Sequence, residues 1–567
     1  MERPSIREPL QLSPTLTVAS TPRLTHQVLV RGAHPHAERA PLPFRHLATY
    51  AVGHVLNDMC AAVWFSYLLL YPQEAEALSG RLAGAVMFSG QLADALATPL
   101  VGLASDAGRG CCLLGRRKAW NLAGVLMVAA NFSFMFCFSL LPAWGALAPT
   151  PKAAVLGLFA ALFNVGWAAV QVSHMALVPE LTRDEGERVQ LNSARYAFTV
   201  LSNCAVFLVM LGLLPTAASA SDTSPDAQYK QPRVYQQLAL VVLGVGLACS
   251  AVFLGLGWEP TAQQLAQRAR EDEAAEAGGG GQGGGGSSSS GSSSGSSGGS
   301  GGPAAPEGAE APLLPRAAAP QRRGSGEEGA HYDVATWRDW LRVPDFWRVM
   351  AVYMLVRLSV NISQVYLTFF VVETLAMSQS AVAVTPLLLY LAQLVSTGLS
   401  RRIAVRLGRR RSIFLGSALT VAAGASMLFI QPGASSPAVY ASVLLLGGGL
   451  ALSMVISVSL EADLVGNRLG SAAFVYGACS FADKLSSGVF VLGIQTMRDL
   501  SYPKGSPHHE LFIRLVNSVI PAAAALLAAV IASTLHFPGA PKGGGGGGAL
   551  NDDEGEGSGK AWAAETS

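Results

Sequence analysis

Two charged residues, Asp483 and Lys484, stand side by side within an apolar run of helical length, in the stretch YGACSFADKLSSGVF. If this run crosses a lipid bilayer, each charge costs about 2.5–3.5 kcal/mol on insertion scales. Neighbouring residues on a helix point about 100° apart, so these two charges do not fully neutralise each other. We therefore expect Lys484 to reach an acid on another helix, and Asp483 to reach a base, for which Arg357 is available.

Other apolar runs also carry polar side chains, which indicates a polar cavity because charged residues at membrane depth are rare and usually functional. The first run holds Asn57 and Asp58, and the second holds Asp94 and Thr98 one helical turn apart. Asp58 and Asp94 are the candidate partners of Lys484. Further candidates for the cavity lie in three other runs: Gln171, Arg195, Arg357, Asn361 and Gln364. Acids could meet an ammonium group or a proton, and bases could meet a carboxylate, so the cavity suits a zwitterion or a coupled cation.

The composition is that of a membrane protein. The chain has 567 residues, of which 50% are hydrophobic and only 13% are charged, whereas soluble domains carry about 25% charged residues. The net charge of +2 is spread over loops and forms no basic patch, so we expect no nucleic-acid partner. The seven cysteines are scattered and match no disulfide framework or metal spacing. No nucleophile–base pair stands out, so we expect neither an enzyme nor a cofactor.

A window of about 20 apolar residues predicts an all-α membrane protein with twelve spanning helices in two sets of six. The first set lies near 46–71, 82–104, 119–141, 152–178, 194–215 and 235–257. The second set lies near 346–373, 382–400, 412–431, 437–463, 470–495 and 511–536. The predicted domains are a disordered N-terminal tail, a six-helix half, a Gly/Ser-rich disordered linker, a second six-helix half and a disordered C-terminal tail, at 1–44, 45–258, 259–344, 345–537 and 538–567.

Lysine and arginine gather in the loops that follow alternate helices, which predicts that these loops, both termini and the linker face the cytosol. The loop after the second predicted helix reads GLASDAGRGCCLLGRRKAW. Its residues Asp106, Arg116 and Arg117 are candidates for a cytosolic gate. Membrane topology alone is an equally good explanation of the basic residues in this loop.

The same loop, with Gly102 and Asp106 followed by a Gly-Arg-Arg triplet, resembles the signature of the major facilitator superfamily. The segments YAVGHVLNDM, DALATPLVG, LVPELTRDEGERVQLNSARYAF and DKLSSG resemble its glycoside–pentoside–hexuronide:cation symporter branch and the animal relatives of that branch. The resemblance implies two pseudo-symmetric six-helix halves with the substrate site between them at the membrane midplane. It also matches Asp58, Asp94, Arg195 and Lys484 to functional positions of the branch.

The resemblance to the animal relatives implies a cysteine importer of the lysosome and melanosome membranes that acts in pigmentation by alternating access. Bacterial sugar symporters of the branch carry acids where this chain has Thr98 and Gln171, which weakens the case for a sodium site. Proton coupling through Asp58 or Asp94 and uncoupled transport both stay open. The alternatives are a sodium- or proton-coupled sugar or glycoside symporter and a non-transporting scaffold that recruits partners through its long cytosolic linker. In each case we expect membrane lipid to surround the helices.

One short motif in the predicted linker concerns sorting. The segment EGAEAPLLP places Leu313 and Leu314 after Glu310, similar to an acidic dileucine signal that adaptor proteins bind. The acid lies three residues before the first leucine, one fewer than is usual. The sequence therefore predicts adaptor binding through the cytosolic linker, and an unused Pro-Leu-Leu segment is the alternative.

Overall fold

The computed structural model describes residues 43–107, 114–182, 184–216, 231–261, 337–433, 436–465, 469–504 and 508–535, with a few single residues beside these ranges. The described residues are almost entirely helical and contain no β-strand. Residues 1–42, 271–336 and 536–567 lie outside the described part of the chain. The predicted tails and most of the predicted linker, including Leu313 and Leu314, fall there.

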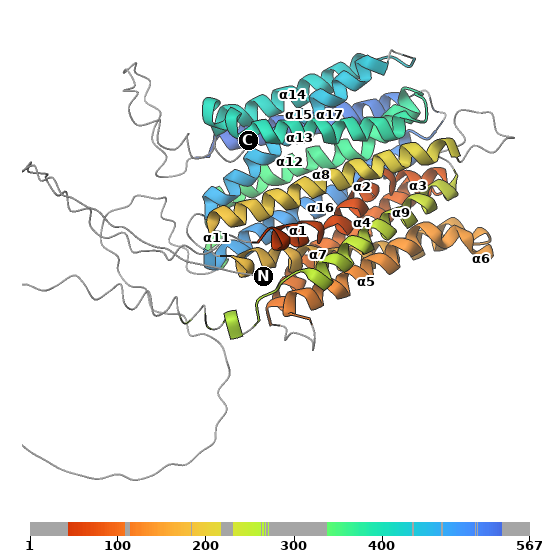
Figure 1. Ribbon diagram of the computed structural model, residues 1–567. Helices are drawn as coiled ribbons and strands as arrows, with labels where there is room; N and C mark the ends of the chain where they lie inside the picture. The colour runs from red at the N-terminus through yellow and green to blue at the C-terminus, as the bar shows by residue number, and fades with distance from the viewer. Residues whose placement is uncertain are drawn as a thin grey trace, which may run out of the picture. The chain divides into compact units, whose positions relative to one another are not determined.

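The first half consists mainly of long helices (Figure 1). Its helices are α1 (Phe44–Val52), α2 (Val55–Tyr67), α3 (Leu70–Glu74), α4 (Gly80–Ala107), α5 (Arg116–Cys137), α7 (Pro149–Leu181), α8 (Glu185–Thr216) and α9 (Pro232–Leu256), with the short η1 (Phe138–Leu140) and α6 (Pro142–Gly145) between α5 and α7. Proline at the first turn of α7 and α9 suits these helix starts, because the missing amide hydrogen would have no partner there.

The first predicted helix, near 46–71, is not continuous, and this corrects the prediction. It breaks between α1 and α2 at Gly53, where the chain approaches α7 and α9 closely. A Cβ atom on Gly53 would lie 2.7 Å from the Phe253 ring and 2.8 Å from Nε2 of His174. The break makes His54 the N-cap residue of α2 and places Asp58 in its first turn.

The second half repeats the pattern. Its helices are α11 (Trp337–Trp340), α12 (Pro344–Phe369), the π-helical η2 (Phe370–Thr374), α13 (Ala381–Leu407), α14 (Arg409–Phe429), α15 (Ser436–Val465), α16 (Leu469–Ser501) and α17 (His509–Ser533). A helix or a broken set of helices therefore covers each of the twelve predicted apolar runs. Ten of the described helical segments are long and apolar enough to cross a membrane. The other two predicted spans are the broken first one and α16, which carries the charged pair.

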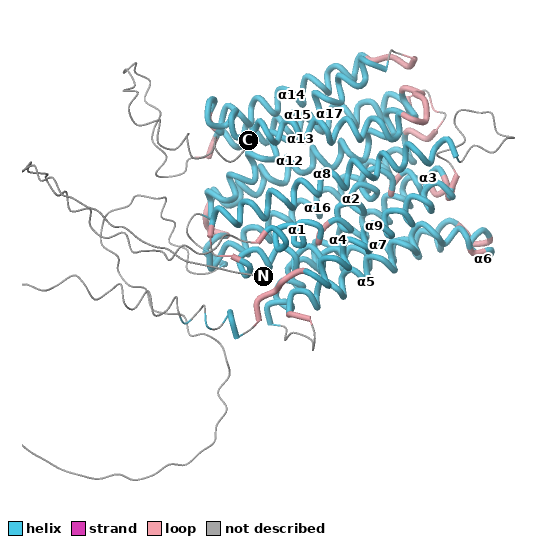
Figure 2. The backbone as a smooth tube through the Cα atoms, in the orientation of Figure 1, coloured by secondary structure: helices cyan, strands magenta, loops and turns pink. Residues whose placement is uncertain are grey.

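The two halves meet through reciprocal helix pairs. α4 packs against α16, α8 packs against α13, and α2 packs against α12. In the first two pairs, the second helix of one half packs against the fifth helix of the other. In the third pair, the first helices of the two halves pack against each other. The helices of both halves run side by side in Figure 2. This arrangement brings the polar stripes of α2, α4, α8, α12 and α16 to the contact between the halves.

Candidate functional site

Lys484 joins the two halves at the α4–α16 contact. Its Nζ lies 2.6 Å from Oδ1 of Asp94 and donates a hydrogen bond of 2.9 Å to Oγ1 of Thr98. Thr98 in turn donates to the same Asp94 oxygen over 3.0 Å. The side chains of Lys484 and Asp94 are 12% and 8% exposed. The expected contact of Lys484 with an acid of the other half is present, and Asp94 rather than Asp58 is the partner.

The Asp483 side chain lies on a different side of α16 from Lys484, and its described contacts are with residues of the second half. Nε of Arg357 lies 2.8 Å from its Oδ2, and Nδ2 of Asn361 donates to its Oδ1 over 2.9 Å. Asn361 also donates to Oγ of Ser487 over 2.8 Å. Adjacent charges on α16 thus have separate partners, as helical geometry predicts. The predicted contact with Arg357 is present.

Asp58 forms a third buried polar cluster, inside the first half. Its Oδ1 lies 2.9 Å from Nδ1 of His54, and Oγ1 of Thr199 donates to its Oδ2 over 2.8 Å. Arg195 stands one turn before Thr199 on α8, and its buried Nε has no hydrogen-bond partner within the described residues. α8 begins at Glu185, earlier than the predicted helix near 194–215, so Arg195 lies ten residues inside its helix.

The remaining predicted site residues lie near these clusters with smaller roles in the network. Asn57 donates to the carbonyl oxygen of Trp167 over 3.1 Å, and the indole of Trp167 donates to Oε1 of Gln171 over 2.9 Å. Gln364 is buried on α12, one turn beyond Asn361. Asn57 and Gln171 thus both bond Trp167, through its carbonyl oxygen and its indole respectively.

The predicted gate residues contact one another, and their described contacts stay within the first half. Nη2 of Arg117 lies 2.7 Å from Oδ1 of Asp106, and Nη1 of Arg116 donates to the Asp106 carbonyl over 2.8 Å. Both arginines also reach Oε1 of Glu180, at 2.9 and 2.8 Å. In the second half, Arg409 pairs with Asp463 at the corresponding helix ends. In both halves, therefore, arginines at the start of the third helix pair with an acid near the end of the fourth.

Glu259, which the sequence did not single out, caps α5. Its carboxylate accepts hydrogen bonds from the backbone amides of Arg117 at 2.7 Å and Lys118 at 2.9 Å, where an acid stabilises a helix start. A Cβ atom on Gly115 would lie 2.2 Å from Cδ of Glu259. The glycine of the loop signature therefore leaves room for this cap.

Gly115→Ala is accordingly expected to displace Glu259 and lower the free energy of unfolding by about 1 kcal/mol, the usual value of an N-cap. Glu259→Ala should have a similar effect, and the double variant should be no worse than either single one, because all three lose the same contact. Thermal unfolding of the purified protein measures this. Additive losses in the double variant would contradict the assigned cap.

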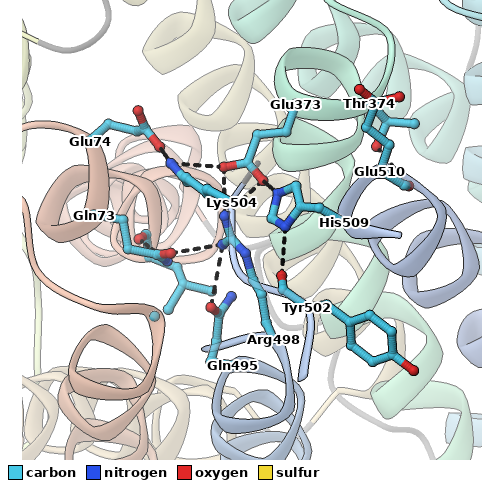
Figure 3. Close-up of polar contacts among 12 residues, drawn as sticks. Gln73, Glu74, Glu373, Thr374, Gln495, Arg498, Tyr502, Lys504, His509 and Glu510 are labelled. Atoms are coloured by element: carbon cyan, nitrogen blue, oxygen red, sulfur yellow. Dashed lines mark hydrogen bonds and ion pairs between the residues drawn. The ribbon is translucent and has the colours of Figure 1, made fainter. Parts of the chain in front are cut away.

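An ion-pair network at the opposite end of the helices also joins the halves (Figure 3). Nη2 of Arg498 lies 2.7 and 2.8 Å from the two carboxylate oxygens of Glu373, and its Nη1 donates to Oε1 of Gln73 over 2.7 Å. Lys504 bridges Glu74 of the first half and Glu373 of the second. His509 lies 3.1 Å from Glu373 on its other side. We call these residues the Glu373 network.

A further contact at this end ties α4 to α16. The backbone amides of Gly80 and Arg81, at the start of α4, donate to the Asp499 carboxylate over 3.0 and 2.6 Å. The sequence did not single out Arg498, Glu373 or Asp499 as site residues. The contact partners of these residues are more than 100 positions apart in the chain, so no local spacing reveals them.

The sequence is similar to that of known membrane proteins. The Major Facilitator Superfamily pattern matches residues 50–482. The chain is 35% identical over 480 residues to major facilitator superfamily domain-containing protein 12 of Equus caballus, covering 83% of this chain and 88% of the relative. It is 36% identical over 477 residues to the protein of the same name in Homo sapiens, covering 82% and 87%.

Solved structures share the fold. A crystal structure of a D-xylose-proton symporter aligns with a TM-score of 0.57 at 13% identity, covering 86% of this chain and 97% of that one. A nucleoside transporter aligns with a TM-score of 0.56 at 10% identity, covering 86% and 99%. At these identities the likeness concerns the fold alone, and it confirms the predicted helical architecture in two six-helix halves.

Proposed function

Because this chain belongs to the Major Facilitator Superfamily, in the group of major facilitator superfamily domain-containing protein 12, we propose that it imports cysteine from the cytosol into lysosomes and melanosomes. It is a multi-pass membrane protein of a transporter family and not an enzyme. The proposed mechanism is alternating access, in which the two halves rock around a central site. Both termini and the basic loops face the cytosol in this proposal.

The observation that carries the proposal is the pair of opposite-sign clusters on either side of α16. Lys484 forms one ion pair between the halves, with Asp94, and Thr98 lies beside it. Arg357 and Asp483 form another ion pair within the second half. A zwitterion can exchange partners with such pairs, its carboxylate with an arginine or lysine and its ammonium group with an aspartate. Asn361 adds a hydrogen-bond donor beside the second pair.

The positions of the other polar residues support a small zwitterion over a sodium-coupled sugar. Thr98, which accepts a hydrogen bond from Lys484, stands where bacterial sugar symporters of the branch carry a second acid on this helix. Gln171, at the other such position, accepts a hydrogen bond from the indole of Trp167. Neither supplies the carboxylate that a hard cation site favours.

The Glu373 network supports a state closed toward the lumen. Lys504–Glu74, Arg498–Gln73 and the contact of Asp499 with the start of α4 all cross between the halves at one end. At the end with the basic loops, the described ion pairs stay within a half. Under the proposed topology, the cytosolic end is therefore the one free to separate.

Accumulation of labelled cysteine and cystine in lysosomes purified from cells with and without this protein tests the proposal. We expect accumulation to fall when the protein is absent and to return when the wild-type chain is restored. Equal accumulation in both preparations would overturn the proposed substrate. Uptake of a labelled sugar that depends on the protein and on a sodium or proton gradient would instead favour the symporter alternative.

A further inference from the structure

Glu461 on α15 is a buried acid that has no cation bound to it among the described residues. The residue is 4% exposed. Its buried Oε1 has no hydrogen-bond partner within the described residues, and the carboxylate is hydrogen-bonded to the Cys479 side chain. The acids Asp58, Asp94 and Asp483 differ, because each contacts an imidazole, an ammonium or a guanidinium group. Glu461, one turn before the end of α15, is therefore the exception among these four buried acids.

The surroundings of Glu461 are mostly apolar. Its helix neighbours Leu460 and Leu464 belong to a buried cluster that also contains Val475 and Cys479 of α16. An ionised carboxylate without a counter-ion is costly in such a place, so the group is stable there as the neutral, protonated acid. The structure thus holds a proton-binding group that none of the ion pairs uses.

Glu461 is also coupled to the second of the two central ion pairs. The ionisable groups that interact with it are Tyr353 and Arg357 on α12, and Tyr476, Cys479 and Asp483 on α16. Tyr353 precedes Arg357 by four residues, and Cys479 precedes Asp483 by four. One helical turn of about 6 Å therefore separates Tyr353 and Cys479 from the Arg357–Asp483 pair along their helices.

We propose that Glu461 binds the proton whose movement is coupled to transport, and that its ionised carboxylate competes with Asp483 for Arg357. While Glu461 is neutral, Arg357 stays with Asp483. When the Glu461 O–H bond breaks and the proton leaves to water, the carboxylate becomes a second anion that competes for Arg357. Since Arg357 is one of the two proposed contacts of the substrate carboxylate, the other being Lys484, proton and substrate binding are linked, and the linkage acts equally in both directions. This inference rests on the proposed transport function.

The test uses the full-length protein in proteoliposomes and labelled cysteine as the probe. Counterflow, with cysteine on both sides and no pH gradient, measures substrate exchange alone. Net uptake driven by an imposed pH gradient measures coupling. For Glu461→Gln, which mimics the neutral acid, we expect counterflow within about twofold of wild type, as for a neutral substitution. Gradient-driven uptake should fall by about 100-fold, the lower range of what a positioned proton-transfer group contributes.

Two variants complete the design. Glu461→Asp keeps an acid and should keep gradient-driven uptake. This variant still tests the proposal if the glutamine variant does not fold. Asp345→Asn is the matched control, because Asp345 is also a buried acid of the second half but pairs with Arg348 at the start of α12. It should keep both activities near wild type.

The outcomes separate the two proposals. If wild-type protein shows no cysteine counterflow, the proposed function is wrong. If wild-type counterflow is present but a pH gradient does not drive uptake, or if Glu461→Gln responds to the gradient as wild type does, the function stands and the Glu461 inference is wrong. Loss of gradient-driven uptake in Glu461→Asp would also overturn it.

Discussion

Replacing Lys484 by alanine is expected to abolish transport and to reduce the amount of folded protein. The change leaves Asp94 buried without its cation, 2.6 Å from where the ammonium group stood. Breaking a buried ion pair by removing one partner costs about 3–5 kcal/mol, a large part of the stability of an ordinary domain. Uptake of labelled cysteine into proteoliposomes and size-exclusion chromatography of the solubilised protein measure the two effects.

The matched control is the double variant Asp94→Asn with Lys484→Ala. It removes both charges, so it should restore folded protein to near the wild-type amount while transport stays absent. Lys484→Arg keeps the charge and should fold normally. Wild-type transport by Lys484→Ala would show that the ion pair between the halves has no role in the cycle. Failure of the double variant to recover folded protein would show that the lysine stabilises the protein through other contacts.

Replacing Arg498 by alanine is expected to open the luminal end. Arg498 makes two contacts with Glu373 and one with Gln73, so its loss removes a link between the halves and leaves Glu373 with Lys504 and His509. A link of about 1.4 kcal/mol changes a two-state population by about tenfold. A cysteine substituted for Gln91, which is buried on α4, should then react about tenfold faster with an impermeant maleimide from the luminal side.

Two controls frame this prediction. Arg514→Ala removes another buried arginine, which donates to the carbonyl oxygen of Leu428 within the second half, and should leave the labelling rate unchanged. The same cysteine labelled from the cytosolic side should react more slowly in Arg498→Ala than in the parent. An unchanged luminal rate in Arg498→Ala would mean that the Glu373 network does not hold the luminal end closed.

The helical architecture was predictable because membrane spans carry their own signal. Each of the twelve apolar runs is long enough to cross a bilayer, and the backbone of each must satisfy its hydrogen bonds within the helix. The contacts of Asp483 and Lys484 were predictable for a related reason. Helical geometry forces neighbours apart, and the cost of a charge at membrane depth requires a partner from another helix. Few charged residues in the spans were available as partners.

The break at Gly53 was not predictable, because it depends on the close approach of His174 and Phe253 from distant helices. The Glu373 network was missed for a similar reason, since its members meet only when the halves assemble. Glu461 did carry a signal, as an acid inside the predicted helix near 437–463. That its buried Oε1 has no hydrogen-bond partner among the described residues is visible only in the packed structure.

Uptake of labelled cysteine by liposomes that contain only the purified protein tests the central claim most directly. The account predicts saturable uptake by the wild-type protein, competition by unlabelled cysteine, and no uptake by the folded double variant Asp94→Asn with Lys484→Ala. Cysteine uptake no greater than in protein-free liposomes, from wild-type protein shown to be folded, would contradict it.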